Sequence, residues 1–173
     1  MYKAILILTI LLVAFPILMS GQEQSVNVET ESSSPYVDKI LNGPITIEGL
    51  RQMPYKVWFV KNFKTYLPDT ETLQEIPKKQ LENVKILAFM GTWCHDSNRE
   101  IPRLVKVCEE LGISERLELY AVDVDKTSRL EKEKGWELKR TPTIIVLRNG
   151  EELGRILEEP EVSFEHSLSL ILK

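Results

Sequence analysis

The sequence predicts an α/β domain in which a central mixed sheet is flanked by helices and preceded by an N-terminal helical extension. A short apolar run, residues 85–91, is compatible with a buried strand, and a helical pattern follows it. Residues 116–125 alternate like a strand, and Asn149-Gly150 separates two further apolar runs, which is a strong hairpin signal. Strands joined through helices favour parallel neighbours, whereas the hairpin adds an antiparallel edge.

Residues 1–21 have the order of a secretory signal peptide. Lys3 precedes an almost uninterrupted apolar run at residues 4–19, and Ser20 and Gly21 follow it. Because the run is shorter than the roughly 20 residues that span a bilayer comfortably, we favour a cleaved signal over an uncleaved anchor. A soluble core helix is disfavoured at an extreme terminus, and the absence of a nearby cysteine disfavours a bacterial lipoprotein.

An exported chain is therefore expected, in the periplasm first, and otherwise extracellular or anchored facing outward. Disulfides persist in such compartments. The chain left after cleavage, about 150 residues, is enough for one domain with a real core. The whole sequence has a net charge of -4 with both signs mixed along its length, and it shows no basic patch for nucleic acid. We expect a monomer without a cofactor that contacts a membrane only through an uncleaved N-terminus.

Two segments separate the signal from the predicted domain. Residues 22–37 are rich in Ser, Glu and Gln and have little to bury, so they are expected to form a flexible leader. Residues 38–83 are interpreted as an extension that packs on the core. Within it, aromatic residues three or four apart predict a helix bracketed by Pro54 and Pro68. This aromatic face, from Tyr55 to Leu67, either covers the core or binds a partner or substrate.

The elements after Pro68 follow from local signals. Asp69 can cap a helical segment that Pro77 interrupts. The helix after the first apolar strand carries its apolar residues at helical spacing and stops at Gly112. Residues 127–135 predict a short charged helix, residues 141–157 a strand, turn and returning strand, and Ser163 the cap of a last helix.

Four features of residues 84–173 occur together. Trp93 and Cys94 close the first apolar strand and open a helix, and Pro102 lies eight residues after Cys94. Thr-Pro-Thr around Pro142 begins a later strand, and the Asn-Gly turn and Gly154 follow it. In this order they resemble the thioredoxin superfamily.

The resemblance implies a three-layer thioredoxin-like fold with Cys94 exposed at a helix N-terminus and Pro142, as a cis-proline, packed opposite it. It also implies that the backbone of Thr141 is available to pair with an extended substrate. Trp93 would give the substrate an apolar platform beside the sulfur, although a role as a core-edge aromatic explains it equally well.

The chemistry of Cys94 can be argued from its position. The thiolate is the reactive form of cysteine, and a helix N-terminus favours the anion through unpaired N–H groups and the helix dipole. His95 could add positive charge and assist the thiolate, whereas Asp96 pulls the other way. A metal site formed by these three residues is disfavoured, because adjacent side chains on one turn point in different directions.

The sequence departs from the dithiol family pattern at two positions. Ser97 stands where the second cysteine would resolve a mixed disulfide, and a serine hydroxyl can hydrogen-bond a thiolate but cannot resolve a disulfide. Ala88 stands where thioredoxins usually place a buried acid. Cys108 cannot replace the missing cysteine, because 14 helical positions amount to about 21 Å, whereas a disulfide needs Cα atoms within roughly 7 Å. It shares an apolar stripe, so a buried structural cysteine is expected.

Three function classes stay open. The first, which we favour, is monothiol thiol-disulfide exchange, in which Cys94 attacks a protein disulfide or a glutathione adduct and an external thiol, glutathione or a partner protein, finishes the reaction. The second is a client-holding module that binds client thiols covalently without turnover. The third is a domain that binds a partner noncovalently in the groove beside Pro142. The predicted catalytic residues are Cys94 and Ser97, and the predicted substrate-contacting residues are Trp93, His95, Asp96, Thr141 and Pro142.

Overall fold

The structure is a computed structural model and describes residues 25–173. The predicted signal, residues 1–21, lies outside the described residues, as do the first residues of the leader. Two sheets are present: a five-stranded sheet of order β3-β5-β4-β6-β7 and a two-stranded sheet of β1 and β2. The strands are β1 (Glu29–Glu31), β2 (Lys39–Leu41), β3 (Gly43–Ile45), β4 (Val84–Met90), β5 (Leu117–Ala121), β6 (Thr143–Arg148) and β7 (Glu151–Leu157).

The helices lie in three places along the chain: between β3 and β4, between β4 and β5, and after β7. The α-helices are α1 (Ile47–Leu50), α2 (Lys56–Thr65), α3 (Thr70–Gln74), α4 (His95–Leu111) and α5 (Phe164–Ile171), and the 3-10 helices are η1 (Lys78–Leu81) and η2 (Ser114–Arg116). Within residues 25–173, no helix combines the length and apolar character needed to cross a membrane.

The five-stranded sheet is mixed, as the sequence predicts. Its central strand β4 pairs in parallel with β5, and in antiparallel with β6, which in turn forms the antiparallel hairpin with β7. Parallel pairing was also expected for the strand after residues 127–135, and this is wrong, because β6 runs antiparallel to β4. β3 pairs antiparallel with β5 at the other edge. The segment before residue 84 therefore contributes a strand to the sheet as well as helices.

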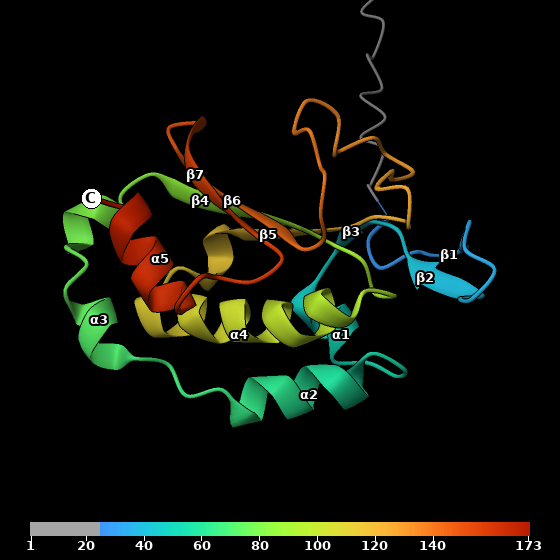
Figure 1. Cartoon of the computed structure of the whole chain (residues 1–173), viewed down its shortest axis with the longest axis horizontal. Helices are drawn as coiled ribbons and strands as arrows, with labels where there is room; N and C mark the ends of the chain where they lie inside the picture. The colour runs from blue at the N-terminus through green and yellow to red at the C-terminus, as the bar shows by residue number, and fades with distance from the viewer. Residues whose placement is uncertain (1–24) are drawn as a thin grey trace, which may run out of the picture.

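The helices cover one face of the five-stranded sheet. Figure 1 shows α4 and α5 against this face and α2 as a further layer outside α4. The irregular segment between β5 and β6 covers the opposite face, where Trp136 and Leu138 pack against a buried cluster that includes Phe89 and Ile145. The result is a layered α/β fold whose central strand is buried on both sides.

The aromatic face of α2 packs inward. Phe59 is fully buried, and its ring stacks on Phe63 with centroids 6.0 Å apart. Asn62 adds a side-chain hydrogen bond of 2.9 Å to the backbone oxygen of Asn98 on α4. Of the two interpretations of this aromatic face, the structure therefore supports a cover for the core.

The expected flexible leader is wrong for its described part, residues 25–37. β1 lies within it and pairs antiparallel with β2. The hydroxyl of Ser32 and the backbone N–H of Ser33 both donate to the carboxylate of Asp123, at 2.9 and 2.8 Å. Strand pairing with β2 and hydrogen bonds to a distant carboxylate hold this segment in place.

The short helix predicted at residues 127–135 is also wrong. The segment forms successive turns, and Glu131 within it and Lys126 just before it have positive φ angles of 54° and 66°. Ser128 donates a hydrogen bond to the Glu133 carboxylate and is largely buried. Because Leu130 is the sole apolar side chain of the segment, a helix there would have no apolar face to pack on the sheet.

Candidate active site

Cys94 lies at the junction between the central strand and the longest helix. β4 ends at Met90, and the backbone N–H of Cys94 donates to the carbonyl of Gly91 at 3.0 Å, which closes a tight turn. Cys94 then occupies the N-cap position of α4, and its own carbonyl accepts from the N–H of Asn98 at 3.0 Å. The thiol is half-buried at the N-terminal end of a 17-residue helix, where backbone N–H groups lack helical partners.

The loop before β6 faces this thiol. Sγ of Cys94 lies 3.1 Å from the backbone oxygen of Thr141, so the S–H group donates a hydrogen bond to it. The peptide bond between Thr141 and Pro142 is cis, and Thr141 is buried. The structure thus brings together the three residues that the resemblance placed opposite one another.

Trp93 is held beside the site by its indole. Nε1 of Trp93 donates to the backbone oxygen of Val122 at 3.0 Å, which ties the active-site turn to the end of β5. Gly91 lies directly under the ring, where a Cβ atom would overlap the indole. Thr92 accepts a hydrogen bond from the N–H of Leu41 at 3.2 Å and ties the same turn to β2.

Ser97 occupies the position of the missing second cysteine. It is fully buried, and its hydroxyl accepts the N–H of Gly91 at 3.2 Å. Within residues 25–173 the hydroxyl makes no hydrogen bond with Cys94, whose thiol is directed to Thr141 instead. Ser97 therefore supports the backbone turn around Cys94 in this structure.

The two residues that follow Cys94 face solvent to different degrees. The His95 side chain is 90% exposed, and its Nδ1 lies 3.9 Å from the carboxylate of Asp96. Nη1 of Arg99 binds the same carboxylate at 2.9 Å. The charge of Asp96 beside the thiol is thus paired within α4. Among the described residues, no group of three or more His, Cys, Asp or Glu side chains is arranged to hold a metal ion.

A buried carboxylate on α4 was not anticipated from the sequence. Glu100 is 1% exposed and is bound by Nε of Arg99 at 2.5 Å and by Nη1 of Arg103 at 2.9 Å. The Arg99-Glu100 ion pair raises the pKa of the Arg99 guanidinium further. The spacing of Glu100 and Arg103 was the only sequence signal, and such pairs are usually solvated.

Two consecutive residues after β7 bridge the walls of the site. The N–H of Glu158 donates to the carbonyl of Pro142 at 2.8 Å, and its carboxylate binds Arg140 at 3.1 Å. Glu159 binds Nη2 of Arg99 on α4 at 2.8 Å. One short segment therefore holds both the cis-proline loop and the active-site helix.

Cys108 is far from this chemistry. It is fully buried in the main core, and burial raises the pKa of its thiol to about 12. Both cysteines are free thiols. Ala88, in β4, is fully buried between its strand partners Leu119 and Ile144, so no acid lies at that position below the site.

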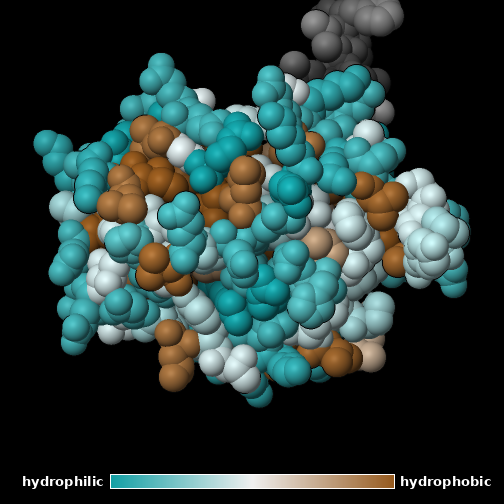
Figure 2. Space-filling view, viewed as in Figure 1, coloured by the Kyte–Doolittle hydropathy of each residue, from teal (hydrophilic) through white to brown (hydrophobic). Residues whose placement is uncertain are grey.

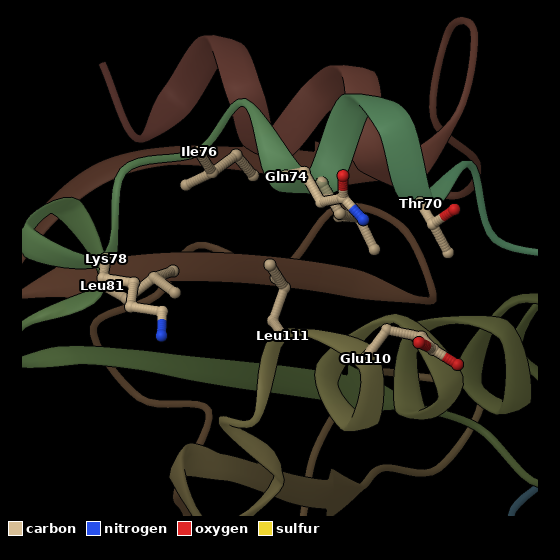
Figure 3. Close-up of a pocket in the computed structure, with 8 residues that line it drawn as sticks. Thr70, Gln74, Ile76, Lys78, Leu81, Glu110 and Leu111 are labelled. Atoms are coloured by element: carbon tan, nitrogen blue, oxygen red, sulfur yellow. The ribbon is translucent and has the colours of Figure 1, made fainter.

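A pocket of about 280 Å³ lies at the other end of α4. Leu111 and Glu110, the last residues of α4, form one side of it. Figure 3 shows Ile76 and Gln74 on the opposite side, with the Lys78 side chain near Leu81. None of its lining residues is a cysteine or histidine, so it does not take part in the thiol chemistry.

Comparison with known proteins gives one curated relative. No family model matches the chain. Thioredoxin H9 from Arabidopsis thaliana is 28% identical over 81 residues, or 46% of this chain. The match covers 54% of the relative, so the chain spans about half of that protein's length.

Solved structures give weaker likenesses. A protein of unknown function from Pseudomonas aeruginosa has a TM-score of 0.44 with 20% identity, over 68% of this chain and 78% of that chain. Thioredoxin from Fasciola hepatica has a TM-score of 0.35 with 20% identity, over 49% of this chain and 77% of that chain.

The half-buried thiol at the start of α4 lies against the loop of Thr141 and Pro142. A cysteine that opens the helix after the central strand and touches a cis-proline loop is what the resemblance to thioredoxins implies. The curated relative adds sequence similarity to a thioredoxin. The chain is therefore similar to a thioredoxin in sequence over 81 residues, and its mixed sheet flanked by helices is a thioredoxin-like fold.

Proposed function

We propose that the protein performs monothiol thiol-disulfide exchange through Cys94. The observation that carries the proposal is the pairing of an accessible thiol at the N-terminus of α4 with a serine, Ser97, at the resolving position. The only other cysteine, Cys108, is fully buried 14 positions further along the chain. An intramolecular disulfide between them would require α4 to unfold.

The reaction consists of two exchanges. The Cys94 thiolate attacks one sulfur of a protein disulfide, forms a mixed disulfide, and releases the other sulfur as a thiolate that takes up a proton. An external thiolate then attacks the mixed disulfide, either at the client sulfur, which returns the Cys94 thiolate, or at Cys94, which releases the client thiol. Glutathione or a partner protein would supply this second thiol, and the clients are protein disulfides or thiols.

The structure suggests a role for each surrounding residue in this reaction. The carbonyl of Thr141 accepts the S–H proton in the resting state. A client strand entering beside Pro142 would meet the thiol there, with Trp93 on the side of β5. Arg99 pairs with Asp96, and its positive charge reduces the repulsion between the Asp96 carboxylate and a Cys94 thiolate.

Intact mass after reaction with oxidised glutathione tests the proposal. We expect one glutathione on the wild-type protein and on Cys108→Ala, none on Cys94→Ser, and release of the adduct by added reduced glutathione. An adduct that persists in excess reduced glutathione would favour the client-holding module instead. If no adduct formed on Cys94, both the exchange function and the client-holding function would be overturned, and the noncovalent binding module would remain.

We also propose that the protein is exported, with the periplasm as its compartment. This rests on the order of residues 1–21, and on the use of a reactive thiol where disulfides persist. Mass spectrometry of the N-terminus of protein recovered from a fractionated bacterial host tests it. A periplasmic product that begins after Ser20 or Gly21 supports it, and an intact cytoplasmic product contradicts it.

A further inference from the structure

Arg99 is bound by three carboxylates, one on each nitrogen of its guanidinium group. Nη1 binds Asp96 at 2.9 Å, Nη2 binds Glu159 at 2.8 Å, and Nε binds Glu100. The face shown in Figure 2 is mostly hydrophilic, and ion pairs on such a surface are usually solvated and weak. Arg99 differs, because its side chain is only 26% exposed and its planar guanidinium holds its partners in fixed directions. It therefore fixes Glu159 relative to α4.

The cis-proline loop is held on both sides of Thr141 by one residue, Glu158. The Glu158 carboxylate binds Arg140 at 3.1 Å, and its backbone N–H donates to the carbonyl of Pro142 at 2.8 Å. Thr141 lies between these two anchor points, and its carbonyl accepts the S–H group of Cys94. The position of that carbonyl relative to the thiol therefore depends on where Glu158 lies.

Glu158 is linked to Arg99 through the next residue, Glu159. Glu158 has a left-handed backbone with a φ of 60°, and the N–H of Glu159 donates to the carbonyl of Leu157 at 2.8 Å, which turns the chain sharply. The two consecutive carboxylates accordingly bind different partners, one in the cis-proline loop and one on α4. A continuous set of contacts thus runs from the helix that carries the thiol to the loop that accepts its hydrogen bond.

We propose that Arg99 is a positioning residue, which holds the Cys94 thiol against the Thr141 carbonyl by fixing Glu159 and Glu158 to α4. The inference rests on the proposed function, because this contact affects the reaction only if Cys94 is the attacking group. The S–H group must leave the Thr141 oxygen and give its proton to water before the sulfur can attack, since the thiolate is the nucleophile. Arg99 therefore restrains the resting thiol and slows its reaction with a small disulfide.

Infrared spectroscopy of the S–H stretch tests the proposal in a Cys108→Ala background, where Cys94 carries the only thiol. A hydrogen-bonded S–H group absorbs at a lower wavenumber than a free one. Glu159→Gln breaks the charged link to Arg99 at a small cost in stability, because the Glu159 carboxylate is 68% exposed. We expect its S–H band to move to a higher wavenumber. We also expect the protection of the Glu158 amide against hydrogen exchange to fall about threefold.

Arg103→Gln is the matched control for Arg99→Gln. Either variant leaves the buried Glu100 with one cationic partner, so both lose stability for the same reason. Within residues 25–173, however, Arg103 forms no ion pair with Glu159. We expect Arg99→Gln to shift the S–H band of Cys94 and Arg103→Gln to leave it at the wild-type position, which separates positioning from a general loss of stability.

The rate of reaction with oxidised glutathione completes the test. Glu159→Gln should react about twofold faster than wild type, because its thiol is less restrained, and Arg103→Gln should match wild type. An unmoved band in Glu159→Gln, or an equal shift in Arg103→Gln, would overturn the positioning role. A moved band with an unchanged rate would show that Arg99 has no part in the reaction. A wild-type thiol inert to glutathione would instead overturn the proposed function, while the band would still test the contact.

Discussion

The thiol of Cys94 donates a hydrogen bond to the backbone oxygen of Thr141, with 3.1 Å between Sγ and that oxygen. The contact joins the N-terminus of α4 to the cis-proline loop before β6. A client that pairs with the Thr141 backbone must arrive where the thiol already points. Docking of the client and release of the S–H group from its acceptor are therefore expected to occur at the same place.

Ser97→Cys should convert the monothiol site into a dithiol one. Cys94 and Ser97 are three residues apart across the first turn of α4, where side chains are neighbours, so a disulfide is within reach. After mild oxidation we expect the variant to lose two hydrogens by intact mass and to resist alkylation of both thiols.

The control is the variant that also carries Cys94→Ser, which keeps the new thiol but has no partner for it. It should show no such loss of mass. If Ser97→Cys stayed fully reduced under conditions that oxidise dithiothreitol, residue 97 would not be placed to form a disulfide with Cys94.

Gly91→Ala should destabilise the protein by about 1 to 3 kcal/mol, the usual range for overpacking. The new methyl group would overlap the Trp93 indole, whose hydrogen bond to Val122 prevents it from moving freely. Urea unfolding measures the loss. Gly154→Ala is the comparison, because its methyl group would approach the Ile171 side chain at 3.1 Å rather than overlap it, and should cost less. Equal stability of Gly91→Ala and wild type would refute the close approach.

Acid should loosen the β1–β2 hairpin through Asp123. Burial acts to raise the pKa of this carboxyl, but hydrogen bonds from Ser32, Ser33 and Val124 outweigh burial and lower it. A lowered native pKa means that the ionised group contributes stability fully above the unfolded value of about 3.9, and that this contribution is lost as pH falls through the native value.

Amide exchange at Ser33 measures this effect. The protection factor should fall in the wild type as the pH is lowered from about 4 through the native pKa of Asp123, and it should fall less in Asp123→Asn, which has no charge to lose. Several other carboxyls titrate in this range, so the difference between the two proteins is the informative quantity. The same loss of protection in both would assign the acid response to another group.

Arg99→Gln should cost about 2 kcal/mol of stability, because Glu100 would remain buried with one cationic partner instead of two. Glu159→Gln removes a single pair whose carboxylate is 68% exposed, so its cost should be about 0 to 1 kcal/mol. Urea unfolding of both variants gives the comparison. Equal losses would show that the burial of Glu100 is not what makes Arg99 important.

The central part of the fold could be predicted because its signals are local. β4, α4 and the β6–β7 hairpin each follow from apolar spacing or from a turn dipeptide within a few residues. The mixed sheet and the thioredoxin-like fold are accordingly confirmed. The helix predicted at residues 127–135 was wrong because the prediction rested on charge and length. The lack of an apolar face on this segment could only be judged against the sheet that it covers.

The β1–β2 hairpin and the charged bridges could not be predicted because they depend on distant partners. Ser32 is 91 positions from Asp123, and Arg99 is 60 positions from Glu159. Of the predicted site residues, Cys94, Thr141 and Pro142 lie together, whereas the hydroxyl of Ser97 faces Gly91. The roles assigned to them stay predictions until the exchange reaction is measured.

Because Cys108 is buried, the number of sulfhydryl groups that react per molecule reports how much of the protein is folded. A reagent that titrates free sulfhydryl groups should find one per native molecule, from Cys94, and two once the core has opened. The second sulfhydryl is therefore an intrinsic probe of unfolding that needs no attached label. It also means that a probe, a spin label or a surface can be coupled to the native protein at a single chemically defined point.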